Sequence, residues 1–126
     1  MNTLAPKSIL VVDDEPSVAN TLRMLLRMDG HRVEVAADGE KALAKYREDR
    51  FDLVITDLLM PGKDGLELAR LIKALVPQQP ILLITGHLEA LCDNEKALLP
   101  DIDGLLGKPF SQEELREALK AAFPHG

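Results

Sequence analysis

The chain has 126 residues with 21 acidic and 15 basic side chains, which gives a formal net charge of −6 at pH 7 and a sequence pI near 5.0. Hydrophobic residues make up 46% and charged residues 29%, a balance typical of globular domains and unlike that of disordered or coiled-coil chains. The acidic charge and an aromatic content of only 3% argue against direct nucleic-acid binding through a basic face or an aromatic platform.

The cysteine count and the N-terminal residues point to a reducing compartment. The single cysteine, Cys92, excludes an internal disulfide. No apolar run approaches the roughly 20 residues that a membrane helix needs, and the first residues lack the pattern of a secretory signal. We therefore expect one cytoplasmic domain over residues 1–126, with a core at about 7–123, and no membrane association.

The first part of the chain alternates apolar runs with helical patterns. Residues 9–12 are continuously apolar, as expected for a strand buried on both faces of a parallel sheet. A helical pattern follows, with Pro16 suited to its first turn and Gly30 to its end. Residues 32–36 alternate polar and apolar, which predicts a more exposed edge strand, and Asp38 can then cap a second helix.

The same alternation continues to the C-terminal end. Five predicted strands, each followed by a helix after a short connection, imply an α/β domain with a parallel sheet and helices on both faces. The remaining predicted elements are, in chain order, a strand at 51–56, a loop at 57–64, a helix opened by capping-box spacing at 64–67, a strand at 81–84, a helix at 88–99, a weaker strand at 102–106 and a helix opened by a capping box at 111–114.

Residues suited to phosphoryl chemistry stand at four of the five predicted strand ends. In open parallel sheets, ligands bind beyond the carboxyl ends of the strands. Each residue alone has an ordinary structural explanation, such as a helix cap or a solvated loop position, but the set is harder to explain in that way. It consists of Asp13 and Asp14 after the first strand, Asp57 after the third, Thr85 at the end of the fourth and Lys108 after the fifth.

Three clustered carboxylates require a counter-charge. Two unit charges about 4 Å apart interact by ~4 kcal/mol at an effective dielectric of ~20, so the cluster should take up protons or bind a cation. Oxygen ligands without His or Cys favour a hard ion such as Mg²⁺. The charges of three carboxylates, Mg²⁺ and Lys108 then sum to zero. Asp57 could accept a phosphoryl group in this setting, because such transfer needs mainly positioning and charge neutralisation.

Four motifs surround these residues, and their order and spacing are specific as a set. They read ILVVDDEP at 9–16, LVITDLLMPGKDG at 53–65, LLITG at 82–86 and KPF at 108–110. The set resembles the receiver domain of two-component response regulators, of the chemotaxis-regulator-like type. The resemblance implies a flavodoxin-like (βα)5 fold, a three-layer sandwich around a five-stranded parallel sheet in the order 2-1-3-4-5.

The resemblance also implies a role for each residue of the site. Asp57 would accept the phosphoryl group. Mg²⁺ would be bound directly by Asp14, Asp57 and the backbone carbonyl of Leu59, and mainly through water by Asp13. Lys108 would pair with the phosphoryl oxygens or, before phosphorylation, with Asp57.

Further positions bear on switching. The resemblance implies that Thr85 moves its hydroxyl onto the phosphoryl group and that the Lys108–Pro109 bond is cis. Leu105 stands where receivers usually carry Tyr or Phe, which puts the aromatic half of the usual switch in question. We hypothesise that Leu59 and His87 set the lifetime of the acyl phosphate; a solvated loop position is the alternative reading of His87.

The leading functional hypothesis is a phosphorylation switch. The phosphoryl group would come from the phosphohistidine of a sensor histidine kinase or a phosphotransfer protein. An output partner would bind the face formed by the helix at 88–99, the fifth strand and the last helix, and the domain would be a monomer or a phosphorylation-dependent dimer. It would catalyse only its own phosphorylation and dephosphorylation, so it would not be an enzyme acting on a free metabolite.

Two other functions stay open. One is a receiver-like protein-interaction module that does not depend on phosphorylation, which Leu105 favours slightly. The other is an aspartate-nucleophile phosphatase of the haloacid dehalogenase type. That class places a second acid two residues past the nucleophile. This chain has Leu59 at that position and so lacks a general acid for the leaving group.

Some candidate residues have only ordinary interpretations. We expect His31 to be a surface residue at a turn, and Met24 and Met28 to take part in ordinary helix packing. Cys92 is expected to be a small buried apolar residue, because no His-Asp arrangement surrounds it in the sequence.

Overall fold

A computed structural model describes residues 5–58, 65–86 and 101–123 of the chain. Within these ranges five parallel strands form one sheet in the order β2-β1-β3-β4-β5. The elements are β1 (Ser8–Val12), α1 (Pro16–Met28), β2 (Arg32–Ala36), α2 (Gly39–Glu48), β3 (Leu53–Asp57), α3 (Gly65–Leu75), β4 (Ile81–Thr85), β5 (Gly104–Gly107) and α5 (Gln112–Ala122).

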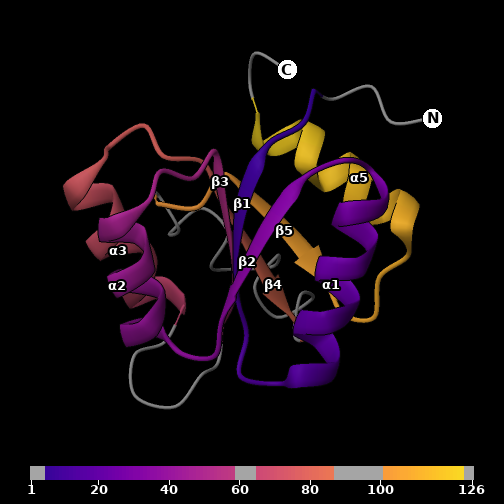
Figure 1. Ribbon diagram of the computed structural model, residues 1–126, viewed down its shortest axis with the longest axis horizontal. Helices are drawn as coiled ribbons and strands as arrows, with labels where there is room; N and C mark the ends of the chain where they lie inside the picture. The colour runs from indigo at the N-terminus through magenta and orange to yellow at the C-terminus, as the bar shows by residue number, and fades with distance from the viewer. Residues whose placement is uncertain (1–4, 59–64, 87–100, 124–126) are drawn as a thin grey trace, which may run out of the picture.

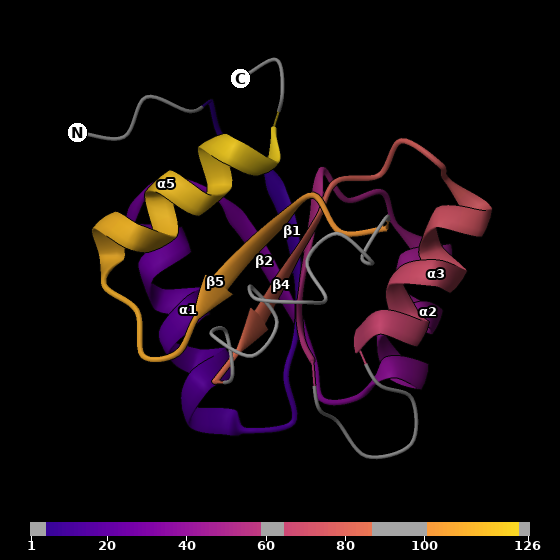
Figure 2. The ribbon, with the colours of Figure 1, turned by 180° about the vertical axis from the view of Figure 1, so that it is seen from behind.

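The sheet lies between two layers of helices. Helices α1 and α5 cover one face, and α2 and α3 cover the other (Figures 1 and 2). Each face has its own apolar core, one joining β1, β3 and β4 to α1 and α5, and one joining the other sides of these strands to α2 and α3. The predicted three-layer α/β fold and its strand order are therefore confirmed. The helix predicted at 88–99 lies outside the described residues.

Burial explains the two kinds of strand pattern. All residues of β3 and β4 are buried, as their continuous apolar runs predict, because helices cover both faces of the sheet. Strand β2 alternates exposed and buried residues and lies at one edge of the sheet, as predicted. The fifth strand covers Gly104–Gly107, so it begins two residues later than the pattern at 102–106 predicts.

Local capping sets where two of the helices begin. The Asp38 carboxylate accepts a hydrogen bond from the Lys41 N–H at 2.8 Å, as predicted. Ser111 and Glu114 form a complete capping box at the start of α5, with reciprocal bonds of 2.9 and 3.0 Å. The capping-box spacing predicted at 64–67 begins in a segment outside the described residues.

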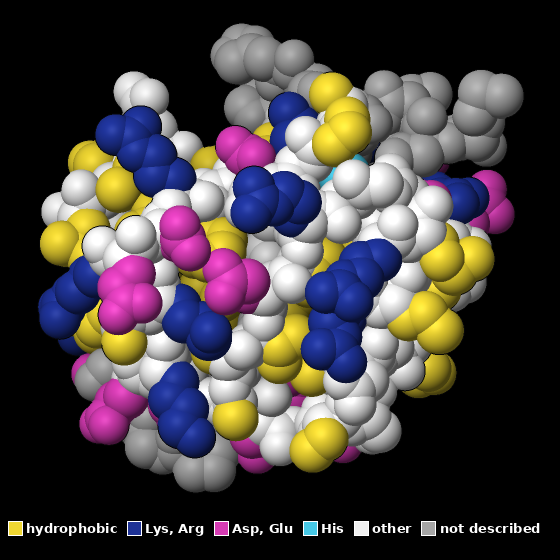
Figure 3. All heavy atoms as spheres, in the orientation of Figure 1, with side chains coloured by type: hydrophobic (Ala, Val, Ile, Leu, Met, Phe, Trp, Pro, Cys, Tyr) yellow, Lys and Arg dark blue, Asp and Glu magenta, His cyan; other side chains and the backbone are white. Residues whose placement is uncertain are grey.

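Two expectations about α1 and its C-terminal turn are wrong. His31 is not a surface residue: it is 4% exposed, and its Nδ1 accepts a hydrogen bond from the Lys7 backbone N–H at 3.0 Å. Met24 and Met28 do not pack inside, because they lie about 200° around the helix from the buried Leu22 and Leu26. They are 56% and 67% exposed. Figure 3 shows apolar side chains exposed beside basic ones on the α1 side of the molecule.

No helix in the described ranges is long and apolar enough to cross a membrane.

Candidate functional site

The carboxyl ends of the strands bring the predicted site residues together. Backbone hydrogen bonds extend the sheet one residue beyond the strands, from the Asp13 N–H to Ala36, from the Leu58 N–H to Ile84 and from the Lys108 N–H to Thr85, at 2.9 to 3.1 Å. These side chains therefore start from a rigid edge, and the loops that follow them do not decide where they begin.

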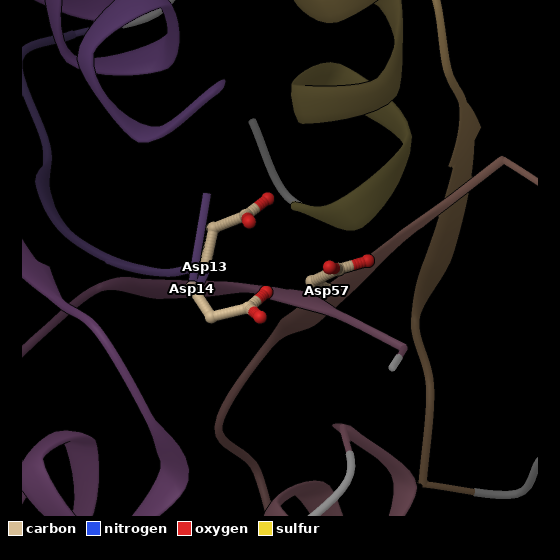
Figure 4. Close-up of side chains that lie close together, drawn as sticks. All are labelled: Asp13, Asp14 and Asp57. Atoms are coloured by element: carbon tan, nitrogen blue, oxygen red, sulfur yellow. The ribbon is translucent and has the colours of Figure 1, made fainter. Parts of the chain in front are cut away.

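Asp13, Asp14 and Asp57 form one cluster at this edge. Each offers a carboxylate oxygen, and these atoms all lie within 4.8 Å of one another. In Figure 4 the three carboxylates, two from the end of β1 and one from the end of β3, point into a common space. Asp13 and Asp57 are buried, at 2% and 6% exposed, whereas Asp14 is open to solvent. The predicted cluster thus exists, with one side accessible.

Lys108 supplies the positive charge of the site. Its ammonium lies 3.3 Å from Asp13 Oδ2 and 3.3 Å from Asp57 Oδ1. A third carboxylate, Glu15, approaches it at 3.8 Å, although its side chain is 61% exposed. The sequence interpretation missed Glu15; the signal was available, since Glu15 directly follows the Asp13-Asp14 pair and opens α1. Solvent screens this extra charge, so Glu15 adds less than the two buried carboxylates.

Burial and neighbouring charges shift the protonation of both central groups. Desolvation and the nearby Asp13 carboxylate raise the pKa of Asp57 above its ordinary value, although Lys108 opposes them. Desolvation alone would lower the pKa of Lys108, but the carboxylates of Asp13 and Asp57 outweigh it and raise that pKa. The site therefore holds Lys108 charged and leaves Asp57 with more negative charge around it than one ammonium neutralises.

The donor set fits a hard divalent cation. Asp13 Oδ1 accepts a hydrogen bond from the Glu15 N–H at 2.9 Å, whereas Asp13 Oδ2 is buried with no hydrogen-bond partner among the described residues. This oxygen forms a 3.3 Å ion pair with the Lys108 ammonium. An unsatisfied buried carboxylate oxygen beside two other carboxylates, with no sulfur or imidazole in the cluster, matches the oxygen ligands that Mg²⁺ prefers.

The predicted switch residues are partly described. Thr85 is buried at 1% exposed and pairs with Gly107 across β4 and β5, which places it next to Lys108. Leu105 is half-buried on β5. The Lys108–Pro109 bond is cis, as predicted. Leu59 and His87 lie outside the described residues, so their proposed tuning of the acyl phosphate stays a prediction.

An open hollow lies next to Lys108, between α1 and the segment that follows β5. Its volume is about 380 Å³. The residues around it are mainly apolar or small: Ser17, Val18, Thr21, Lys108, Pro109 and Phe110. Of the clustered site residues, Lys108 alone is among those that line this hollow.

Comparison with known proteins gives one family. The sequence model of one protein family, the response regulator receiver domain, matches residues 9–120. The response regulator MprA of Mycolicibacterium vanbaalenii is 39% identical over 92% of this chain and 50% of its own length, and the transcriptional regulatory protein TrcR of Mycobacterium tuberculosis is 36% identical over 92% of this chain and 45% of its own length. The chain spans about half the length of these curated relatives.

Solved structures agree with this result. The chemotaxis response regulator CheY4 of Vibrio cholerae has a TM-score of 0.84 at 32% identity, covering 94% of this chain and all of the other. The response regulator TrrA of Thermotoga maritima, solved in complex with Mg²⁺-BeF, has a TM-score of 0.82 at 36% identity, covering 93% of this chain and 99% of the other. With its motifs, fold and acidic cluster in agreement, this chain belongs to the receiver domain family of two-component response regulators.

Proposed function

We propose that this receiver domain accepts a phosphoryl group on Asp57 in a Mg²⁺-dependent reaction and thereby switches a protein-interaction surface. The observation that carries the proposal is the meeting of Asp13, Asp14 and Asp57 beside the Lys108 ammonium at one sheet edge. The site holds three carboxylates and one ammonium, an excess of negative charge that a purely structural cluster would not retain. Phosphoryl transfer depends on positioning and on charge neutralisation, which these groups can supply.

The proposed step is a direct transfer. A carboxylate oxygen of Asp57 attacks the phosphorus of a phosphohistidine, so that a P–O bond forms, the P–N bond breaks and its electron pair stays on the imidazole nitrogen. A bound Mg²⁺ would neutralise charge on the phosphoryl oxygens. Lys108, now 3.3 Å from Asp57 Oδ1, would pair with a phosphoryl oxygen, and the Thr85 hydroxyl would donate a hydrogen bond to another.

Residues of this chain would hold the ion. Asp14 and Asp57 would ligate it directly, together with the backbone carbonyl of Leu59. Asp13 would act mainly through water, with its unsatisfied Oδ2 as the acceptor.

Response regulator receivers work with histidine kinases and output domains, and we propose both kinds of partner for this chain. A sensor histidine kinase or phosphotransfer protein would be the donor, and part of its surface would occupy the hollow beside Lys108. An output partner would bind the face that includes β5 and α5. We further propose that the domain works in the cytoplasm, as a monomer or a phosphorylation-dependent dimer, without binding nucleic acid or membrane, and that it turns over no free metabolite.

Covalent labelling tests this proposal. The wild-type domain is incubated with acetyl phosphate and Mg²⁺ and analysed by intact mass and site mapping. We expect one added phosphoryl group on Asp57, none in Asp57→Asn, and none when EDTA replaces Mg²⁺. Asp52→Asn serves as a control, since Asp52 lies before β3 and bonds the Ser8 N–H at the other edge of the sheet. Equal labelling of wild type and Asp57→Asn would refute the acceptor assignment.

Leu105 favours a second candidate, a receiver-like module whose partner binding does not require phosphate. An aliphatic side chain occupies this half-buried position on β5, where an aromatic switch residue would be expected. The two candidates differ in one measurement, namely whether acetyl phosphate with Mg²⁺ changes the NMR shifts of β5 and α5. Labelling at Asp57 without any change there would favour the second candidate.

A further inference from the structure

The start of α3 packs directly onto the backbone of the proposed acceptor. The Gly65 N–H donates a hydrogen bond to the Leu58 carbonyl at 2.8 Å. A Cβ atom placed on Gly65 would overlap the Asp57 carbonyl oxygen, and it would lie 3.0 Å from the Asp57 carbonyl carbon and 3.1 Å from Leu58 Cα. All three are backbone atoms, so no side-chain rotation could make room.

Space, rather than backbone conformation, requires glycine at this position. Gly65 is a helical residue, and Gly30 is the glycine with positive φ in the described part of the chain, at 90°. Alanine is favoured over glycine within helices, so local propensity would argue for a side chain here. The close approach to Asp57 outweighs that preference.

Neither side of this contact can move freely. The Asp57–Leu58 backbone is held from the sheet, because the Leu58 N–H bonds the Ile84 carbonyl at 3.0 Å. Helix α3 is held by Leu68, Ala69 and Ile72, which are all 0% exposed in the core beneath it. A side chain at position 65 would therefore displace the acceptor backbone, the helix, or both.

We propose that Gly65 is a positioning residue for the phosphoryl-acceptor site, a role that rests on the proposed function. Because Gly65 has no side chain, the start of α3 packs against the Asp57–Leu58 peptide. This contact keeps the Asp57 carboxylate next to Asp13 and Lys108. The hydrogen bond from the Gly65 N–H also fixes the Leu58 carbonyl, which belongs to the residue before the proposed ligand Leu59. Mg²⁺ demands near-octahedral geometry, so a small shift of this backbone weakens the site.

The test compares Gly65→Ala with Gly104→Ala. A Cβ on Gly104 would meet the Leu82 Cδ1 atom at 3.0 Å, a flexible side chain that can yield, and Gly104 begins β5 far from the cluster. Three quantities are measured for both variants: the melting temperature, the Mg²⁺ dissociation constant by calorimetry, and the rate of labelling by acetyl phosphate at saturating Mg²⁺.

We expect Gly65→Ala to weaken Mg²⁺ binding and to slow labelling by roughly tenfold each, as for other residues that orient metal ligands. Gly104→Ala should keep both within about twofold even where its melting temperature falls, since alanine there touches only packing atoms. A folded Gly65→Ala variant with wild-type Mg²⁺ affinity and labelling rate would overturn the positioning role.

A second pair of variants decides the matter if Gly65→Ala does not fold. Leu68→Ala creates a cavity under α3 and weakens its packing on the sheet. Leu119→Ala creates a similar cavity under α5, in the core on the other face of the sheet. Only Leu68→Ala should weaken Mg²⁺ binding and labelling; equal effects in both would overturn the inference. A wild-type domain that neither binds Mg²⁺ nor is labelled would instead refute the proposed function, and the role of Gly65 with it.

Discussion

Carboxylates near the N-terminal ends of the strands and those near the C-terminal ends differ in how fully they are paired. At the edge where the strands begin, acidic groups meet matching donors. Asp29 forms a two-point ion pair with Arg116, at 2.7 and 2.8 Å, which joins the end of α1 to α5. Asp103 Oδ2 accepts hydrogen bonds from Lys73 Nζ and from the Ile81 N–H, both at 2.9 Å. These carboxylates are satisfied, and they hold neighbouring elements together.

At the edge where the strands end, the balance is different. Asp13, Asp57 and the more exposed Glu15 share one ammonium, that of Lys108. Asp14 adds a further carboxylate to the cluster. The pKa of Asp57 is raised by burial and by its acidic neighbour, so the ionised form costs stability in the absence of a counter-ion.

The difference separates structural charges from functional ones. A carboxylate that stabilises the fold is paired with donors that stay in place, as Asp103 is. Under the proposed function, a carboxylate of the site is left partly uncompensated, so that a cation and a phosphoryl group would complete its charge balance. Four substitutions, in order of decreasing expected effect, test this difference between the two sets of carboxylates.

The largest effect is expected from Lys108→Met. Removing the shared ammonium leaves the buried Asp13 and Asp57 carboxylates facing each other and should lower the free energy of unfolding by about 2–3 kcal/mol without Mg²⁺. Added Mg²⁺ should restore part of the loss, which urea denaturation with and without the ion would measure. The control is Lys120→Met, whose exposed 3.7 Å pair with Glu117 should contribute under about 0.5 kcal/mol. Equal losses would contradict the contrast.

Asp103→Ala should follow in size. The change leaves the N–H of the buried Ile81 without its acceptor and removes the partner of Lys73, for a loss of about 1–2 kcal/mol in the free energy of unfolding. Labelling by acetyl phosphate should proceed at the wild-type rate, because no site residue is touched. A slowed reaction in a fully folded variant would show that the two edges are coupled.

Asp57→Asn should stabilise the domain at neutral pH. Because the pKa of Asp57 is raised in the fold, its contribution to stability is present at low pH and is lost as the pH rises through that pKa. A neutral amide avoids this loss, so the melting temperature at pH 7 without Mg²⁺ should rise by about 3 °C. The gain should shrink as the pH is lowered through the raised pKa. A lower melting temperature for the variant at pH 7 would count against an uncompensated charge.

The smallest effect concerns His31, which lies near the ends where the strands begin. Burial lowers its pKa from the ordinary value of 6.5, with Lys7 acting in the same direction and Asp29 opposing. Its contribution to stability is therefore complete above pH 6.5 and is lost as the pH falls through the lowered pKa. His31→Asn keeps an acceptor for the Lys7 N–H and should flatten this part of the pH profile, followed by thermal melting. An unchanged slope would assign it to other groups.

Much of the fold follows from local patterns. The apolar runs of β1 and β4, the cap at Asp38 and the box at Ser111 are visible in the chain because each depends on neighbouring residues. Of the predicted site residues, Asp13, Asp14, Asp57 and Lys108 come together as expected, because parallel strands end on the same side of the sheet. Local patterns could not predict the burial of His31, because it depends on packing against the Lys7 backbone, 24 residues away. The exposure of Met24, in contrast, follows from its position on the helix relative to Leu22 and Leu26.

Periodicity alone predicted the alternating strands and helices of a parallel α/β domain, because hydrophobic runs and capping residues act over a few positions. The order and spacing of the motifs gave the resemblance that implied the strand order and the family. Contacts between distant segments were decided only by packing. Glu15 approaches Lys108, and Asp29 forms an ion pair with Arg116. Gly65 packs against the Asp57 carbonyl, which is possible because glycine has no side chain. Each contact depends on how closely two elements approach each other, and only the assembled core sets these separations.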